Sequence, residues 1–186
     1  MTTSSDGLDL TIIKQAANGD VDAYGEIYSI YVDRIYRYVF YQVKDKMLAE
    51  DITEDTFVRA WKVIKTCRGR EETFSAWLYR VAHNRMVDVI RKNHRLVPLE
   101  EVETVNDADP EEEADKRLAR QSVMNAVATL PEPQKQLILL KFINGADNNE
   151  IGRVMQKGQG AVRALQMRAL DNLRQKLSAG VKNHGR

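Results

Sequence analysis

Arginines recur along the segment 160–179, near the C-terminal end of the chain. At the helical period of about 100° per residue, one broad face is apolar, and it holds Val162, Leu165, Ala169, Leu170, Leu173 and Leu177. The opposite side holds Arg163, Met167, Arg168 and Arg174. Guanidinium groups bind phosphates and guanine edges in paired hydrogen bonds, so this face predicts nucleic-acid recognition. The alternative is an ordinary helical bundle with a solvated cationic face.

A shorter amphipathic run, residues 148–156, precedes this segment and turns Ile151, Val154 and Met155 inward. The connection Gln156-Lys157-Gly158-Gln159-Gly160 leaves room only for a sharp turn. Two helices joined by a tight glycine-containing turn form a helix-turn-helix. Its second helix can place its N-terminal residues in the major groove. The glycines leave the first N–H groups of that helix open to a phosphate.

Residues that could support catalysis or bind a metal are few and scattered. His83, His94 and His184 lack the spacing of a metal site, and Cys67 has no neighbouring histidine in the sequence. No glycine-rich phosphate loop follows a strand. We therefore predict no enzyme activity, no metal and no cofactor. A single cysteine excludes an intrachain disulfide and fits a reducing cytoplasm.

Charge is distributed unevenly along the 186 residues, although the net charge is only +1. Residues 1–99 carry 15 basic and 14 acidic side chains, residues 100–115 carry 9 acidic and no basic ones, and residues 116–186 carry 13 basic and 4 acidic ones. This asymmetry indicates a basic binding module joined to an acidic connection. No apolar run is long enough to span a membrane and the N-terminus does not resemble a signal peptide, so we expect a cytoplasmic protein without membrane insertion.

The periodic segments are helical, and no alternating strand pattern stands out. We predict an all-α fold with helices at 9–18, 20–43, 47–65, 73–94, 113–129, 133–143, 148–156 and 160–179. Asp20 and Asp22 are candidate caps for the second of these helices, and Asp147 or Asn148 for the seventh. Acidic residues and two prolines mark a linker. The predicted organisation is two helical domains, residues 1–95 and 116–186, joined by an acidic linker at 96–115, with a helix-turn-helix in the C-terminal domain.

Two segments build the predicted core of the N-terminal domain. An apolar and aromatic stripe in residues 24–43 consists of Tyr24, Ile27, Tyr28, Tyr31, Ile35, Tyr38 and Val39. In the segment 49–64, the inward face holds Ile52, Thr56, Ala60 and Val63. Phe57 and Trp61 extend this face toward an acidic edge, which suits a protein-docking site because aromatic side chains dominate interface hot spots. The alternative is an acidic N-terminal half that the helix dipole favours.

A basic helix with interleaved aromatic residues is predicted at 74–95. Its core candidates are Phe74, Trp77, Leu78, Val81 and Val89, and cations crowd the remaining surface. Cations follow phosphates and aromatic rings stack on bases, so this helix suits single-stranded nucleic acid. The alternative is a solvated basic face.

Taken in order, these segments resemble bacterial RNA polymerase sigma factors of the extracytoplasmic-function (ECF) type in the sigma-70 family. AEDITEDTFVRAW resembles the region that binds the polymerase clamp, and FSAWLYRVAHNRMVD resembles the helix that melts and reads the −10 element. The segment from Leu130 to Leu177 resembles region 4, which reads the −35 element. The resemblance covers nearly the whole chain.

The resemblance implies three sets of site residues. The polymerase-binding set is Asp51, Glu54, Asp55, Phe57, Val58 and Trp61. The −10 DNA-binding set is Arg68, Trp77, Arg80, Asn84, Arg85, Asp88, Arg91 and Lys92. The −35 DNA-binding set is Lys157, Gln159, Gly160, Arg163, Met167 and Arg168.

The implied function is that of a transcription initiation factor without catalytic activity of its own. Its expected partners are core RNA polymerase, promoter DNA and an anti-sigma factor, and the free chain is expected to be a monomer. The alternative is a stand-alone helix-turn-helix regulator, which would bind duplex DNA without polymerase. Several positions depart from the family pattern: Cys67 replaces a frequent aromatic residue, Glu54 a frequent glutamine, Ala161 a frequent threonine, Leu165 a frequent arginine, and Gly152 a frequent alanine. At position 152, glycine and alanine both look small enough for close helix approach.

Overall fold

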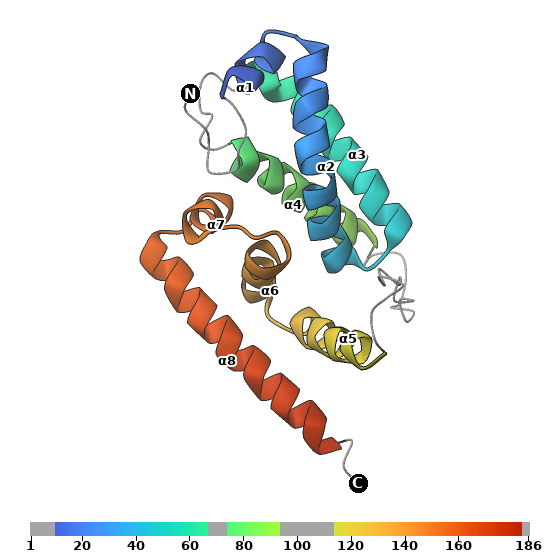
Figure 1. Cartoon of the computed structure of the whole chain (residues 1–186), viewed down its shortest axis with the longest axis vertical. Helices are drawn as coiled ribbons and strands as arrows, with labels where there is room; N and C mark the ends of the chain where they lie inside the picture. Colours follow the sequence, from blue (N-terminus) through green and yellow to red (C-terminus); the bar gives the residue numbers. More distant parts are fainter. Residues whose placement is uncertain (1–9, 67–73, 94–113, 184–186) are drawn as a thin grey trace. The chain divides into compact units, whose positions relative to one another are not determined.

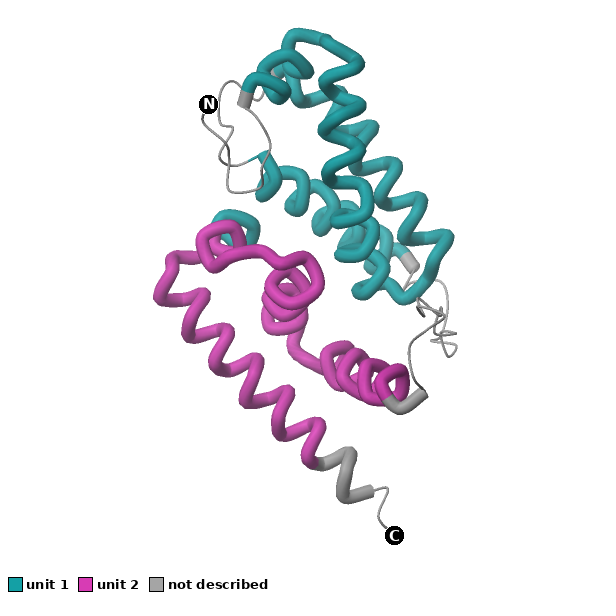
Figure 2. The backbone as a smooth tube through the Cα atoms, in the orientation of Figure 1, with its two compact units in different colours: residues 1–103, 153–156 teal, residues 104–152, 157–186 magenta. Residues whose placement is uncertain are grey.

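A computed structural model describes residues 10–66, 74–93 and 114–183 (Figure 1). The described residues form helices and turns without a strand, which confirms the all-α prediction. Their contacts divide the chain into two compact units: residues 1–103 with 153–156, and residues 104–152 with 157–186 (Figure 2). Most of the predicted acidic linker, residues 96–113, lies outside the described ranges, as does the loop containing Cys67 and Arg68. In the part of the chain that is described, no helix combines the length and apolar character needed to cross a bilayer.

The N-terminal helices are α1 (Leu10–Ala17), α2 (Val21–Val43), α3 (Lys46–Val63) and α4 (Phe74–Asn93), with a 3₁₀ turn at Ile64–Thr66 after α3. These bounds lie within about two residues of the predicted ones. Helix α2 packs against α1, α3 and α4, and α3 also packs against α4.

Aspartate caps define where α2 and α3 begin. The Asp20 carboxylate accepts hydrogen bonds from the N–H groups of Asp22 and Ala23, at 3.0 and 3.1 Å, which confirms Asp20 as a cap. Lys44 then ends α2 in the left-handed region at φ 60°, with its N–H bonded to the Phe40 carbonyl oxygen. Asp45 caps α3 by accepting from the Leu48 N–H at 2.9 Å. Two adjacent residues, Lys44 and Asp45, therefore reverse the chain between α2 and α3.

The predicted aromatic stripe of α2 forms most of the core of this unit. Its buried members are Ile27, Tyr31, Ile35, Tyr38 and Val39. Tyr24 is half-buried, and Tyr28 is 41% exposed, so the prediction that Tyr28 belongs to the core is wrong. Tyr28 lies at the edge of the stripe, where its ring covers a neighbour on α3 rather than entering the core itself.

The C-terminal helices are α5 (Ala114–Ala128), α6 (Glu132–Ile138), α7 (Asn148–Met155) and α8 (Gln159–Asn183). A π-helical turn at Leu139–Ile143 continues α6, and its wider ring is closed by the Asn144 N–H, which bonds to the Leu139 carbonyl oxygen at 3.1 Å. The predicted single helix 133–143 therefore changes its winding part way, as single π turns inserted in α-helices do. Asp147 caps α7 through the Glu150 N–H at 2.8 Å, as predicted.

Helix α6 and the π turn bury Leu137, Leu139 and Leu140, and α6 packs against α8. A side-chain hydrogen bond from Asn172 Nδ2 to Gln134 Oε1, 2.8 Å long, joins α8 to α6. The packing and this hydrogen bond together fix which face of α8 is turned toward α6.

Candidate functional site

The outer face of α3 carries the acidic edge predicted to bind polymerase. Asp51 and Glu54 are exposed, and Val58 is 52% exposed. The spacing of three and four residues places these side chains on one helical face. The opposite face buries Ile52 and Ala60 against the rest of the unit, whereas Val63, predicted on the same inward face, is 42% exposed, so that prediction is wrong. The structure thus brings two carboxylates and one apolar side chain together on an accessible strip.

Phe57 does not belong to this accessible strip. It is only 4% exposed, and its ring packs edge-on against Tyr28 with 4.8 Å between the ring centroids. The expectation that Phe57 contributes to an exposed aromatic surface is therefore wrong. Trp61 is half-buried, with its ring 4.8 Å from that of Tyr24. Rings from α2 cover both aromatic residues of α3, which the pattern of one helix could not reveal.

The Tyr24 hydroxyl fastens α2 to α3. It donates a hydrogen bond to the Phe57 carbonyl oxygen at 2.5 Å. Burial raises the pKa of Tyr24 to about 12, although a hydrogen bond to the backbone at Trp61 acts in the opposite direction. The hydroxyl therefore stays protonated and able to donate far above neutral pH.

Asp55 and Arg85 were predicted to contact different partners, but the structure pairs them with each other. The Asp55 carboxylate lies 2.5 Å from Arg85 Nε on α4, and 3.1 Å from Arg59 Nε on its own helix. The side chains of Asp55 and Arg85 are 33% and 28% exposed. This ion pair joins the helix predicted to bind polymerase to the helix predicted to bind the −10 strand.

Helix α4 presents several of the predicted −10 residues to solvent. Asn84, Arg91 and Lys92 are exposed, whereas Trp77, Arg80 and Asp88 are half-buried. The Trp77 ring lies 5.6 Å from that of Phe74, and the Asp88 carboxylate pairs with Arg91 at 3.0 Å. Arg68, the remaining member of the set apart from Arg85, lies outside the described residues. Asn84, Arg91 and Lys92 are therefore the accessible members of the set on this helix, and Arg91 is already paired with Asp88.

His83, considered as a metal ligand from the sequence, packs within the first unit. Its Nδ1 lies 3.0 Å from the Tyr38 hydroxyl oxygen. Among the described residues, no group of three or more histidine, cysteine, aspartate or glutamate side chains is placed to hold a metal ion.

The turn between α7 and α8 depends on the absence of a side chain at Gly152. The Lys157 N–H donates to the Gly152 carbonyl oxygen at 2.9 Å, and Gln156 takes φ 55°. A Cβ atom on residue 152 would stand 2.8 Å from the Lys157 carbonyl oxygen. Alanine therefore does not fit this turn without a backbone shift, which corrects the expectation that glycine and alanine are equivalent here.

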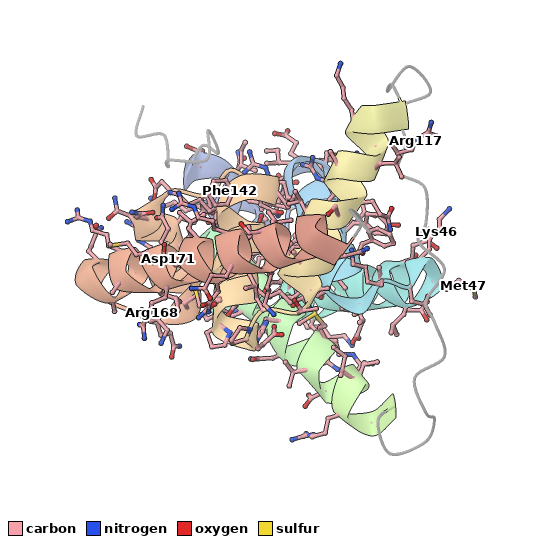
Figure 3. The ribbon with its side chains drawn as sticks, turned by 90° about the horizontal axis from the view of Figure 1, so that it is seen from below. Lys46, Met47, Arg117, Phe142, Arg168 and Asp171 are labelled. Carbon is pink, nitrogen blue, oxygen red and sulfur yellow. The ribbon has the colours of Figure 1, made fainter. Side chains whose placement is uncertain are left out.

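Helix α8 separates a buried face from the exposed face predicted to bind the −35 element. Val162, Leu165 and Ala169 are 0%, 8% and 0% exposed. The predicted −35 residues are all exposed, and they are Lys157, Gln159, Gly160, Arg163, Met167 and Arg168. Figure 3 shows Arg168 and Asp171 on this helix.

Two positions on α8 clarify the sequence prediction. Leu165 is part of the core, so the arginine that is frequent at this family position could not be accommodated in the same way. Leu170 was predicted to face inward but is 40% exposed, so that prediction is wrong. The buried face of α8 is therefore narrower than the apolar face predicted from its sequence. Next to Gly160 there is open space, because a Cβ there would meet nothing within 4 Å.

The sequence analysis missed several exposed apolar side chains, of which three are the most prominent long side chains. They are Met47, Leu118 and Phe142, which are 77%, 69% and 56% exposed. Met47 and Phe142 are labelled in Figure 3. Met47 stands four residues before Asp51, so it extends the accessible strip of α3 by one turn. That spacing was the available signal for Met47, whereas Phe142 follows from the π turn, which the sequence did not indicate.

The described residues form two helical units, one with acidic and basic helices and one with a long helix that exposes cations after a tight turn, which is the arrangement of a two-module helical protein with a helix-turn-helix. The family model for Sigma-70 region 2 matches residues 27–96, and that for Sigma-70, region 4 matches residues 126–175. The ECF RNA polymerase sigma factor SigW of Bacillus subtilis is 32% identical over 177 residues, which cover 89% of this chain and 94% of SigW. The ECF RNA polymerase sigma factor BldN of Streptomyces coelicolor is 34% identical over 168 residues, covering 88% of this chain and 64% of BldN.

Solved structures agree on the fold. CnrH, in a structure with the cytosolic domain of CnrY, superposes with a TM-score of 0.70 at 24% identity, covering 94% of this chain and 97% of CnrH. The sigma factor RpoE of Bartonella quintana, in complex with the anti-sigma factor NepR, superposes with a TM-score of 0.68 at 19% identity, covering 83% of this chain and 96% of RpoE. The chain belongs to the sigma-70 family, among its ECF sigma factors.

Proposed function

We propose that this sigma factor directs core RNA polymerase to promoters with −35 and −10 elements, and that separate surfaces of its two units perform the steps. The observation that carries the proposal is the division of α8 into a buried apolar face and an exposed face bearing Arg163, Met167 and Arg168. In a helix-turn-helix, that exposed face is the one that enters the major groove.

The α8 face binds the −35 duplex in this proposal. Lys157 and the open backbone around Gly160 suit phosphate contacts, which supply most of the affinity and fix the register. Arg163 and Arg168 can donate to guanine edges, and the exposed thioether of Met167 offers an apolar contact between them. The narrow buried face leaves these side chains free to turn toward DNA.

The accessible strip of α3 binds core polymerase. Asp51 and Glu54 supply negative charge, and Val58 supplies apolar area beside it. This composition suits a partner surface with basic and apolar groups. Phe57 supports the strip from beneath rather than contacting the partner.

Helix α4 holds the melted −10 strand. Asn84 can hydrogen-bond to the edge of an unstacked base, and Lys92 can follow the backbone phosphates. Unstacking a base costs a few kcal/mol. Polymerase binding offsets part of this cost, because it holds two weak DNA sites at a set separation and raises their effective concentration.

An anti-sigma factor is the proposed regulatory partner. CnrH and the Bartonella RpoE both superpose on this chain, and the RpoE structure contains an anti-sigma factor. We further propose that the chain acts in the cytoplasm as a monomer until it meets polymerase or this inhibitor, and that it has no catalytic activity or cofactor of its own.

The test is reconstitution of the pure chain with core RNA polymerase, followed by genome-wide mapping of transcript starts. The proposal predicts starts that appear only with the chain and share two upstream motifs. A chain that binds duplex DNA specifically but never associates with polymerase would instead be a stand-alone regulator.

A further inference from the structure

The shared carboxylate of Asp55 lies between two helices with different proposed partners. It is held by Arg85 on α4 at 2.5 Å and by Arg59 one turn further along α3 at 3.1 Å. Both helices belong to the same compact unit and pack against each other. The link between Asp55 and Arg85 is therefore a direct polar connection across the α3–α4 packing.

Neither member of this pair is well placed to be a primary contact for an outside partner. The Asp55 side chain is 33% exposed and that of Arg85 is 28% exposed. Their neighbours on the outer faces, Glu54 and Asn84, are exposed. A guanidinium and a carboxylate that already neutralise each other also contribute less to binding a charged partner.

We propose that Asp55 and Arg85 are positioning residues, whose ion pair fixes the rotation of α4 relative to α3 so that polymerase binding through α3 presents Asn84 to the −10 strand. This inference rests on the proposed function and reassigns two residues that the family resemblance implied as direct contacts. Arg85 stands next to Asn84 in the chain, as Asp55 stands next to Glu54. The ion pair thus connects the residue next to Glu54, on the α3 strip, with the residue next to Asn84, on the exposed face of α4.

Geometry explains why such a pair affects function more than stability. Partly exposed ion pairs contribute little to the stability of a fold. The two charges approach to 2.5 Å across the α3–α4 packing, however, so a rotation of α4 would separate them at a cost in Coulomb energy. Small displacements of a binding side chain weaken recognition much more than they weaken the fold.

The experiment uses holoenzyme assembled from core polymerase and the full chain, with Asp55→Asn, Arg85→Gln and the double variant. The probe is a fork-junction DNA that carries the single-stranded −10 element of a promoter mapped in the reconstitution. Core affinity and fork-junction affinity are measured separately, and circular dichroism follows the unfolding of each free variant. Arg59→Gln is the matched control, since it removes the other cation bound to Asp55 without touching α4.

The positioning role predicts that each single variant weakens fork-junction binding about three- to tenfold. The double variant is expected to bind fork-junction DNA no less tightly than the single variant with the lower affinity, because all three variants lose the same interaction. Core affinity should change by less than about twofold, as should both affinities of Arg59→Gln. Asp55→Glu and Arg85→Lys keep the charges but change the side-chain length, and they provide a second pair of variants. Each is expected to lose part of the fork-junction affinity.

Other outcomes overturn the proposal in recognisable ways. If Arg85 contacts DNA directly, Asp55→Asn frees its charge and leaves binding equal or stronger, while Arg85→Gln weakens it. If Asp55 contacts polymerase directly, Asp55→Asn lowers core affinity and Arg85→Gln does not. If the pair is only structural, both variants unfold at lower temperature while fork-junction affinity is unchanged. A wild-type chain that never binds core polymerase contradicts the proposed function itself and is recognised before any variant is compared.

Discussion

Gly152 and Lys157 meet across the turn of the helix-turn-helix: the Lys157 N–H donates to the Gly152 carbonyl oxygen at 2.9 Å, and a Cβ on residue 152 would stand 2.8 Å from the Lys157 carbonyl oxygen. The backbone can close this tightly because residue 152 has no side chain. Helix α8 begins at Gln159, two residues after Lys157, so this contact also sets the direction in which α8 leaves the turn.

Gly152→Ala is therefore expected to destabilise the turn, although alanine is the better helix former by about 1 kcal/mol. Forcing an extra methyl group against fixed backbone costs about 1–3 kcal/mol. Hydrogen exchange measured by segment should show faster exchange in α7 and at the start of α8. Gly25→Ala is the matched control, because Gly25 also lies inside a helix but a Cβ there meets nothing within 4 Å. It should slow exchange in α2, and equal effects of both variants would contradict the steric account.

Arg163→Ala and Arg168→Ala are expected to weaken binding of holoenzyme to a −35 duplex by about 1–3 kcal/mol each where the arginine contacts a base. Both side chains are exposed on the proposed recognition face. Titration over several salt concentrations separates the roles, since a phosphate contact lowers the salt slope by about one unit and weakens all sequences alike. Arg174→Ala serves as control, because Arg174 is exposed on the same helix but lies two to three turns beyond the N-terminal part that reaches base edges. Equal losses at all three positions would show a diffuse charge effect.

Asp51→Arg is expected to abolish or strongly weaken association with core polymerase while the fold persists. The side chain is exposed on the strip of α3, so the reversed charge meets the partner rather than the core. Glu26→Arg is the control, because it reverses the charge of an exposed carboxylate on α2, outside the strip. Normal co-purification of the Asp51 variant with polymerase would remove the strip from the proposed interface.

Phe57 and Val58 are adjacent residues with opposite expected phenotypes. Phe57→Ala removes a ring that is 4% exposed and packed on Tyr28, so it should cost about 3–5 kcal/mol of stability. Val58→Ala removes atoms that are half-exposed, so the free energy of unfolding should change by less than about 0.5 kcal/mol. Polymerase affinity is measured below the unfolding temperature of each variant. In proportion to the loss of stability, the loss of affinity should be larger for Val58→Ala than for Phe57→Ala. The reverse ranking would indicate that Phe57, rather than Val58, contacts polymerase.

The helices could be predicted from the sequence because periodicity and capping are local. Asp20 and Asp147 are caps with side-chain bonds to residues two or three positions away, so the sequence contains all the required information. The buried face of α8 at Val162 and Ala169 likewise follows from the helical period. Each of these features is determined by the sequence of a single helix and its ends.

Features that depend on a second helix could not be predicted in the same way. Phe57 is buried because Tyr28, itself exposed, covers it from α2. Asp55 and Arg85 are thirty residues apart and meet only because α3 and α4 pack together. The exposure of the predicted −35 residues follows from α8 and its turn alone, whereas the exposure of the residues predicted to bind polymerase and −10 DNA depends on how three helices share a core.

Tyr24→Phe provides a test of the α2–α3 connection through pH. The hydroxyl donates to the Phe57 carbonyl oxygen and its pKa is raised to about 12 from the ordinary 10. The folded state therefore keeps a proton that the unfolded chain releases above pH 10. The stability contributed by this proton is fully present below pH 10 and falls as pH rises toward 12, by about 1.4 kcal/mol per pH unit in that window.

At pH 8, Tyr24→Phe should be less stable than the wild-type chain by about 0.5–1.5 kcal/mol, because the Phe57 carbonyl oxygen loses its donor. Between pH 10 and 11 the difference should shrink and then reverse, since phenylalanine cannot ionise in the unfolded state. Urea unfolding at several pH values measures both effects, and Tyr28→Phe, which alters an exposed tyrosine on the same helix, controls for the general alkaline transition. A stability difference that stays constant from pH 8 to 11 would show that the Tyr24 hydroxyl ionises at the same pH in the folded and unfolded chains, and would contradict its burial against α3.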